Sequence, residues 1–102
     1  MKLNETKIKG LYVAELSAIK DSRGFFARSY CDKELKKINI IKPIKQVNHS
    51  LTSVIGTVRG MHYQNHPHAE VKMIRCISGE VFDVAVDLRQ NSETFLQWHG
   101  EY

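Results

Sequence analysis

The sequence predicts an all-β fold in which short antiparallel strands form a jelly-roll or barrel around a ligand. Turn-forming residues separate short runs rich in β-branched and aromatic residues, and only one stretch has a helical pattern. Several runs also alternate polar and apolar residues, as expected for strands that face a ligand. The 102 residues are 42% hydrophobic and 25% charged, a composition that predicts one globular domain over residues 1–102.

The predicted elements follow the turn signals along the chain. The predicted strands are Leu11–Leu16, Gly24–Tyr30, Lys45–Ser50, Gly56–Tyr63, Val71–Ile77 and Val81–Leu88. A turn at Asp21-Ser-Arg-Gly24 separates the first two. One short helix is predicted around residues 33–38, with Asp32 as its N-cap, and Pro43 prevents its continuation.

The clearest predicted hairpin joins Val71–Ile77 to Glu80–Leu88 through Ser78 and Gly79. A glycine after a serine supplies a tight turn between two β-rich runs. Because side chains alternate along a strand, Asp83 is expected on the face opposite Phe82 and Val84.

Charge and hydropathy limit the class of partner. The net charge of +4 and the pI of about 9.2 favour an anionic ligand. The one basic cluster, residues 33–37, includes Glu34 and lies in the predicted helix, and no aromatic residues are interleaved with it for base stacking, so nucleic-acid binding is not predicted. No secretory signal and no run of about 20 apolar residues is present, which predicts a cytoplasmic protein without a membrane partner.

His62 is the best candidate for a catalytic base. In the run Arg59-Gly-Met-His-Tyr-Gln64, strand alternation places His62 and Gln64 on the face opposite Arg59 and Tyr63. Imidazole has an ordinary pKa of about 6.5, so it accepts a proton near neutral pH. The alternative is a purely structural histidine, and the neighbouring residues decide between the two.

Lys72 lies ten residues after His62, early in the next predicted strand. Proton removal beside a ketone builds negative charge on the ketone oxygen, and a fixed ammonium stabilises that charge. The pair His62 and Lys72 therefore suits enolate chemistry. The alternative for Lys72 is an exposed lysine on a surface strand.

A metal site is the rival interpretation of the same region. Metal-binding cupins have the pattern Gly-x5-His-x-His, then a glutamate, then a glycine, and Gly60, His66, His68 and Gly79 fit that spacing. Lys72 stands at the glutamate position, and an ammonium repels a cation. Glu70 is out of step with the pattern, so no metal is predicted.

The remaining site candidates are polar residues suited to a nucleotide. Arg23 and Arg59 can donate paired hydrogen bonds to phosphate oxygens. Gln46 and Asn48 share a strand face and can bind a base or sugar edge.

Asp83 and Asp87 can orient a histidine or form ion pairs with Lys72 or Arg75. Ordinary ion pairing is the favoured role, and Asp83 is the candidate orienting carboxylate.

The sequence resembles the dTDP-4-dehydrorhamnose 3,5-epimerase family, whose members share a cupin jelly-roll. The resemblance lies in five ordered blocks: Asp21-Ser-Arg-Gly-Phe-Phe26, Gln46-Val-Asn-His-Ser50, Gly56-Thr-Val-Arg-Gly-Met-His-Tyr-Gln64, Lys72, and Gly79-Glu-Val-Phe-Asp-Val-Ala-Val-Asp-Leu-Arg89. Ser92-x-Thr-Phe95 and Trp98 continue it, so the resemblance covers nearly everything from about residue 10 onward.

The resemblance implies that His62 removes protons at C3 and C5 of a 4-keto-6-deoxyhexose nucleotide while Lys72 stabilises the enolate. It implies nucleotide and phosphate contacts from Arg23, Gln46, Asn48 and Arg59. It implies no metal or organic cofactor, and a homodimer whose N-terminal strands reach into the partner's site. The pathway would be deoxysugar synthesis for surface polysaccharide.

Two departures from the family change these expectations. Arg28 stands where many members have a glutamate that contacts the nucleotide, which inverts the local charge and leaves the preferred nucleotide open. The sequence also extends only to Tyr102, a little past half the family's length, so we expect a jelly-roll incomplete at the C-terminus, with unpaired strand edges. The resemblance implies that two further residues lie in the part of the family that this sequence does not match: a tyrosine that returns the proton from the opposite face, and an aspartate that pairs with the base histidine.

Three functions are consistent with the sequence. The first is a sugar-nucleotide 3,5-epimerase, an isomerase that abstracts protons beside a ketone. The second is a catalytically incomplete cupin fragment that binds a sugar nucleotide. The third is a metal-dependent cupin enzyme, which Lys72 disfavours.

Overall fold

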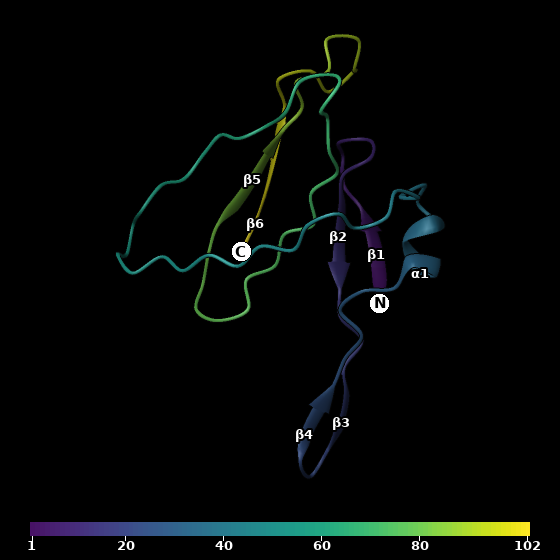
Figure 1. Cartoon of the computed structure of the whole chain (residues 1–102), viewed down its shortest axis with the longest axis vertical. Helices are drawn as coiled ribbons and strands as arrows, with labels where there is room; N and C mark the ends of the chain where they lie inside the picture. The colour runs from purple at the N-terminus through teal and green to yellow at the C-terminus, as the bar shows by residue number, and fades with distance from the viewer.

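The computed structural model describes all residues from 1 to 102. It contains six short strands and one minimal helix, in the order β1, β2, β3, β4, α1, β5, β6 (Figure 1). The strands pair as three separate antiparallel hairpins, β1–β2, β3–β4 and β5–β6. The predicted all-β class is therefore confirmed.

The first hairpin pairs β1 (Lys2–Glu5) with β2 (Tyr12–Glu15). In the loop between the two strands, the Thr6 hydroxyl accepts a hydrogen bond from the Ile8 amide at 3.1 Å. Gly10, in the same loop, has a φ of +89°, which allows the chain to turn back. Ile8 is buried in this loop. Strand β2 lies within the predicted strand Leu11–Leu16, whereas β1 was not predicted because Lys2–Glu5 is mostly polar.

The second hairpin pairs β3 (Ile19–Asp21) with β4 (Gly24–Phe26) and projects from the rest of the molecule like an arm (Figure 1). Its turn lies at Ser22 and Arg23, as predicted, and Asp21 closes it by accepting a hydrogen bond from the Arg23 amide at 2.8 Å. The strand expected over Gly24–Tyr30 ends early, at Phe26.

Helix α1 (Asp32–Lys36) is shorter than the predicted helix and begins one residue earlier. Asp32 was expected to be its N-cap, and this was wrong: the N-cap residue is Cys31, and its side chain accepts no capping hydrogen bond. The Asp32 carboxylate instead forms an ion pair with Lys36 at 3.0 Å, one turn along the helix. Leu35 is the residue that the helix buries.

The third hairpin pairs β5 (Asp83–Val86) with β6 (Trp98–Glu101). The predicted hairpin between Val71–Ile77 and Glu80–Leu88 was wrong. Strand β5 lies within the predicted Glu80–Leu88, but it pairs with β6, which follows it in the chain, and not with Val71–Ile77. Gly79 does adopt a left-handed conformation with a φ of +80°. The turn therefore forms, although the segments on its two sides do not pair as strands.

Residues 41–82 contain no helix or strand. The strands predicted over Lys45–Ser50, Gly56–Tyr63 and Val71–Ile77 are therefore absent from this structure. The physical reason is the lack of a neighbouring strand, because a β-rich run forms a strand only when another one completes its hydrogen bonds. In Figure 1 this segment is the long teal-to-green tube without arrows.

The buried core is small. Only Ile8, Leu35 and Asp87 are buried, and no strand of one hairpin packs on a strand of another. The loop of the first hairpin and the end of β5 share a hollow, which is lined on one side by Ile8 and on the other by residues 85–89. The single helix is much too short to cross a membrane.

Candidate functional site

The two candidate catalytic residues lie in the irregular segment. His62 is exposed and no hydrogen bond or ion pair fixes its ring. Lys72 forms an ion pair with Glu70, whose carboxylate oxygen lies 3.0 Å from the Lys72 Nζ. Both side chains of that pair are nearly half exposed, so the ammonium remains open to a competing anion.

Arg59 is the candidate phosphate ligand closest to His62 in sequence. Its Nη2 donates a hydrogen bond to the Leu51 carbonyl oxygen at 3.1 Å, which ties two parts of the irregular segment together. Gln46 and Asn48, the candidate base or sugar contacts, are exposed and make no hydrogen bond within the chain. Their amides are thus free to donate to and accept from a ligand.

Arg23 lies at the tip of the projecting β3–β4 hairpin. Its Nη2 is 2.6 Å from Asp21 Oδ2, and its Nε contacts the same carboxylate, so the guanidinium is held through one edge. The hydrogen bonds from Arg23 lower the pKa of Asp21 and the bond to Asp21 raises the pKa of Arg23, so both stay charged. The Nη1 group is left for another anion.

The candidate orienting carboxylate, Asp83, is exposed at the start of β5 and makes no ion pair or side-chain hydrogen bond. Its backbone partner in the ladder is Glu101 of β6. The Glu101 carboxylate lies 2.8 Å from His99 Nε2, which makes that histidine the only one paired with an acidic side chain. Asp83 remains a candidate for orienting a histidine only because of its position in the sequence.

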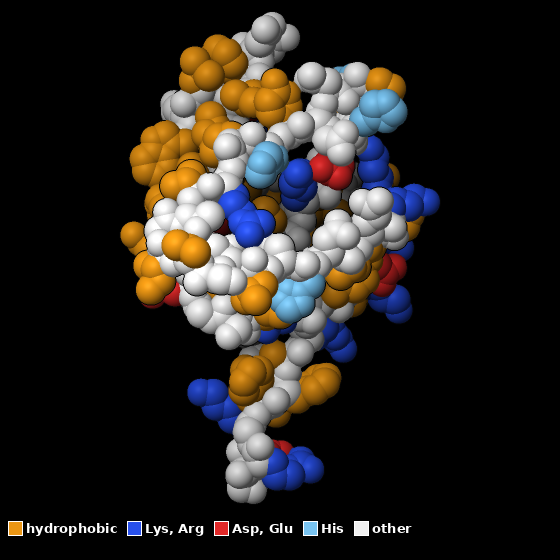
Figure 2. Space-filling view, turned by 60° about the vertical axis from the view of Figure 1, so that its left-hand side comes forward, with side chains coloured by type: hydrophobic (Ala, Val, Ile, Leu, Met, Phe, Trp, Pro, Cys, Tyr) orange, Lys and Arg blue, Asp and Glu red, His pale blue; other side chains and the backbone are white.

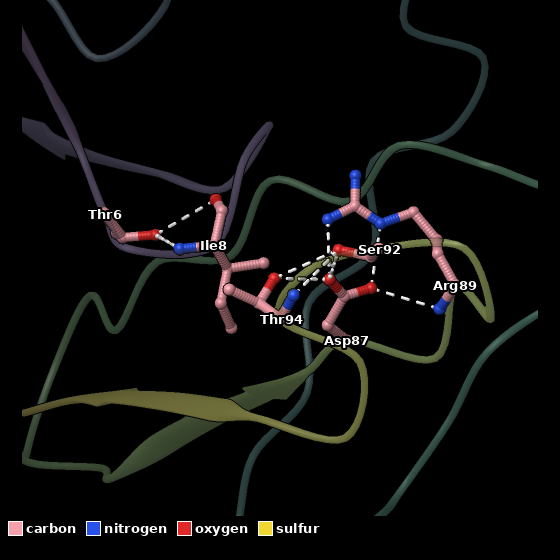
Figure 3. Close-up of polar contacts among 6 residues, drawn as sticks. All are labelled: Thr6, Ile8, Asp87, Arg89, Ser92 and Thr94. Carbon is pink, nitrogen blue, oxygen red and sulfur yellow. Dashed lines mark hydrogen bonds and ion pairs between the residues drawn. The ribbon is translucent and has the colours of Figure 1, made fainter.

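The most densely bonded carboxylate is Asp87, directly after β5 (Figure 3). Its two oxygens accept five hydrogen bonds: from the Arg89 amide, Nε and Nη2, from Ser92 Oγ and from Thr94 Oγ1, at 2.6 to 3.0 Å. These bonds, those from Arg89 first, hold the pKa of Asp87 well below its ordinary value of 3.8. We call Asp87, Arg89, Ser92 and Thr94 the Asp87 cluster.

The Asp87 cluster was not identified as a unit from the sequence. Ion pairing of Asp87 was expected with Lys72 or Arg75, whereas its partner is Arg89, two residues away. The signal was present in the spacing: an aspartate, then arginine at +2, serine at +5 and threonine at +7. Such short hydrogen-bonding side chains close a loop around a carboxylate.

Arg28, the departure from the family pattern, is held by helix α1. Its Nη1 lies 3.2 Å from Glu34 Oε1. Glu34 Oε2 is also 3.2 Å from the Met1 ammonium, and hydrogen bonds from that ammonium and then from Arg28 lower the pKa of Glu34. Arg28 therefore has an acidic partner within the chain that the sequence did not predict.

Seen from one side, Lys, Arg and His side chains gather around a hollowed part of the surface, with an acidic side chain among them (Figure 2). These are the kinds of side chain that bind and deprotonate an anionic ligand. His66 and His68 flank Pro67, and no third histidine, cysteine or carboxylate is grouped with them to complete a metal-binding set.

The antiparallel hairpins define an all-β protein, and its exposed cations suit a phosphate-bearing ligand. A model of the family described as dTDP-4-dehydrorhamnose 3,5-epimerase matches residues 5–102. The chain belongs to this family.

Curated relatives with the name dTDP-4-dehydrorhamnose 3,5-epimerase support the assignment. The Pseudomonas aeruginosa protein is 43% identical over 99% of this chain and 55% of its own length. The Shigella flexneri protein is 41% identical over 98% of this chain and 55% of its own length. An archaeal relative, from Methanothermobacter thermautotrophicus, is 36% identical over 94% of this chain and 51% of its own length.

The chain spans about half the length of the curated relatives it matches. No solved structure gives a significant match. The family match extends over nearly the whole chain, so its range includes His62, Lys72 and the polar residues near them.

Proposed function

We propose that this chain binds a 4-keto-6-deoxyhexose nucleotide and removes the protons beside its ketone, the 3,5-epimerisation for which its relatives are named. The observation that carries this proposal is the family match over residues 5–102, which includes both His62 and Lys72. The preferred nucleotide is dTDP by the relatives' name, and Arg28 is the residue that can change it.

In the proposed reaction, neutral His62 takes a proton from C5 or C3, and the electron pair of the broken C–H bond delocalises onto the ketone oxygen. The Lys72 ammonium donates a hydrogen bond to that oxygen in the enolate. A proton delivered from water to the opposite face of the same carbon gives the inverted sugar, and His62 releases its proton to water, so protons balance and no electrons are gained or lost. Glu70 pairs with Lys72, and because an ammonium has three N–H donors, another of them can donate to the enolate oxygen.

The nucleotide part of the substrate is assigned to the polar residues. Arg23 and Arg59 are proposed to bind the diphosphate, and Gln46 and Asn48 the base or sugar edge. The pairing of Arg23 with Asp21 supports this role, because a guanidinium held through one edge loses little freedom when it binds phosphate through the other. Asp83 is proposed to orient the imidazole of His62.

We further propose that residues 1–102 form one domain of a cupin jelly-roll that functions as a homodimer. The projecting β3–β4 hairpin supports the dimer, since it carries Arg23 together with apolar side chains that nothing in the chain covers: Ile19, Phe25 and Phe26. A second copy that receives this hairpin would bury these side chains and gain Arg23 for its own site (Figure 1).

A second candidate function is binding of the sugar nucleotide without turnover. The observation that favours it is the lack of any carboxylate paired with His62, because an imidazolium without a counter-charge is a poor product of proton abstraction. The two candidates share the ligand and differ in the exchange of its protons.

Solvent exchange separates them. The 4-keto sugar nucleotide is incubated with the chain in deuterium oxide, and label at C3 and C5 is followed by NMR. Wild type is expected to introduce deuterium, and His62→Ala to slow this by about 10²–10⁴-fold. His49→Ala is the matched control, an exposed histidine that should exchange label at the wild-type rate. Binding without exchange in the wild type would support the second candidate.

A further inference from the structure

A hollow of about 300 Å³ lies between the loop of the first hairpin, residues 6–11, and the end of β5. Its volume is at the lower end of the range for small-molecule sites, about 300–1,000 Å³. None of the residues assigned to the substrate or to catalysis lines it. The hollow is therefore a candidate for a ligand of its own.

Arg89 supplies a guanidinium to this hollow with one edge in use and one edge free. Its Nε and Nη2 each lie 2.8 Å from an oxygen of Asp87. A guanidinium has five N–H donors, so Nη1 and the second N–H of Nη2 are left on the outer edge. Figure 3 shows Nη1 directed away from the carboxylate, with no dashed line to it. Two donors on one edge are suited to paired hydrogen bonds with an oxyanion.

The carboxylate of Asp87 does not compete for that place. The Asp87 side chain is only 1% exposed, whereas the Arg89 side chain is 56% exposed. A ligand that enters the hollow from solvent therefore meets the guanidinium, with the carboxylate behind it. The ion pair also fixes the guanidinium before a ligand arrives, which lowers the entropic cost of binding.

The loop opposite Arg89 is held by its own hydrogen bonds. The Thr6 hydroxyl donates to the Leu11 carbonyl at 3.1 Å, and the Leu11 amide donates to the Ile8 carbonyl at 3.0 Å. Gly10 lies beside the guanidinium, since a Cβ at this position would be 3.9 Å from Arg89 Nη1. Because Gly10 has no side chain, the outer edge of the guanidinium stays uncovered.

The other lining residues define the chemistry of the ligand. Lys9 adds a second cation, and Asp87 is the one carboxylate of the lining and already pairs with Arg89. Two cations against one neutralised acid favour a dianion over a monoanion. The rest of the wall is mostly apolar: Ile8, Leu11, Ala85, Val86 and Leu88.

We propose that this hollow binds a small phosphate monoester whose organic part is apolar. The phosphate accepts hydrogen bonds from the outer edge of Arg89 and pairs with Lys9, and the organic part contacts the apolar wall. The strands of the first and third hairpins do not contact one another, so a ligand in the hollow would join two otherwise separate hairpins. The site does not depend on the proposed epimerase reaction.

An NMR titration of the full chain tests the proposal without an activity assay. The probe is phenyl phosphate, added at low salt and about pH 8, where a phosphate monoester is a dianion because its second pKa is about 6. Amide signals of residues 8–11 and 85–89 are expected to shift and to saturate with a dissociation constant of about 1 mM or lower. Inorganic phosphate, which has no apolar part, should bind at least about tenfold more weakly.

Two variants locate the ligand and keep the ion pair between Asp87 and Arg89 intact. Lys9→Gln removes one cation and should weaken phenyl phosphate binding about fivefold. Gly10→Asn, which tolerates the positive φ, places a side chain beside the guanidinium and should weaken binding at least about tenfold. The matched control is Lys7→Gln, which removes the same charge from the same loop at a residue outside the lining and should bind like the wild type.

Three results would overturn the proposal. The first is a set of shifts confined to the surroundings of Arg23, Arg59 and Lys72, since the probe would then bind only at the candidate substrate residues. The second is equal weakening by Lys7→Gln and Lys9→Gln, which would show attraction by net charge and not by the hollow. The third is wild-type binding by Gly10→Asn, because the outer edge of Arg89 would then not be the phosphate contact.

Discussion

Asp87 shows how a single carboxylate can order a loop where no core is present. Its five hydrogen bonds connect the end of β5 to Ser92 and Thr94, so the chain turns back and the backbone amide of Leu96 bonds to the Asp87 carbonyl at 2.8 Å. The β5–β6 hairpin follows directly from this turn. The charge of Asp87 is therefore part of what holds the hairpin together.

The first prediction concerns the pH dependence of that hairpin. The pKa of Asp87 is lowered in the folded state, so its stabilising effect is complete above the ordinary value of 3.8 and is lost as the pH falls below it. Unfolding of β5–β6, followed by fluorescence of Trp98, should become easier below about pH 4. Asp87→Asn should lose stability at pH 7 and remove most of this acid dependence.

Asp83→Asn is the control for Asp87→Asn, because Asp83 lies in the same hairpin and has no ionic partner. It should leave the acid transition where it is in the wild type. An Asp87→Asn variant with the wild-type acid transition would show that another carboxylate controls the hairpin.

At the scale of elements, the sequence pattern predicted the turns correctly but not which strands pair with each other. The Ser22–Arg23 turn and the left-handed Gly79 were predicted because a turn depends on a few neighbouring residues. The predicted partner of β5 was wrong because pairing depends on which strand lies beside it in three dimensions. The alternation of polar and apolar residues does not specify that neighbour. The polar strand β1 gave no apolar pattern to detect.

In the candidate site, the residue types were predictable from the sequence and their side-chain partners were not. Residue types indicated a base, a lysine and phosphate ligands, and these roles stay predictions. The partners of those residues could not be predicted: Arg23 with Asp21, Lys72 with Glu70, and Arg28 with Glu34. Each depends on side-chain positions around a turn or a helix, which the sequence pattern does not specify.

The second prediction concerns strand β6. A methyl group at Gly100 would overlap the ring of Phe82, which packs on Tyr102 with 4.7 Å between ring centroids. Gly100→Ala should therefore displace Phe82 and destabilise the β5–β6 hairpin by about 1 kcal/mol, at the low end for overpacking because Phe82 is half exposed and can move. Urea unfolding followed by Trp98 fluorescence measures this. Gly79→Ala, in a turn outside the hairpin, should not change the hairpin transition.

The third prediction concerns helix α1. Leu35 is one of the few buried apolar side chains, so Leu35→Ala should destabilise the packing of the helix by about 2–3 kcal/mol. Limited proteolysis near residues 32–36 should then be faster than in the wild type. Ile41→Ala truncates an exposed side chain and should leave the cleavage rate unchanged.

At the scale of the whole molecule, the hairpins form an extended assembly and not a compact domain. The radius of gyration is 15.5 Å, whereas a compact domain of this length has about 12.8 Å. The β3–β4 hairpin contributes to this extension (Figure 1). This hairpin is the part of the chain that the proposed dimer would cover.

The fourth prediction tests the proposed dimer through that hairpin. Phe25→Ser with Phe26→Ser should weaken self-association by at least about tenfold, because each phenylalanine buries apolar area worth about 1.5–3 kcal/mol. Sedimentation equilibrium measures the dissociation constant. Ile41→Ser, an exposed apolar residue outside the hairpin, is the control and should dimerise like the wild type. An unchanged constant in the double variant would place the dimer contact elsewhere.

Chemical rescue tests most directly whether His62 is the base of a proton-abstraction site. His62→Gly removes the imidazole and leaves space for one from solution. Deuterium exchange into the 4-keto sugar nucleotide should fall by about 10²–10⁴-fold in this variant and rise in proportion to added imidazole. Lys72→Gly should lose exchange without such rescue. Exchange in His62→Gly at the wild-type rate, with or without imidazole, would contradict the assignment of His62.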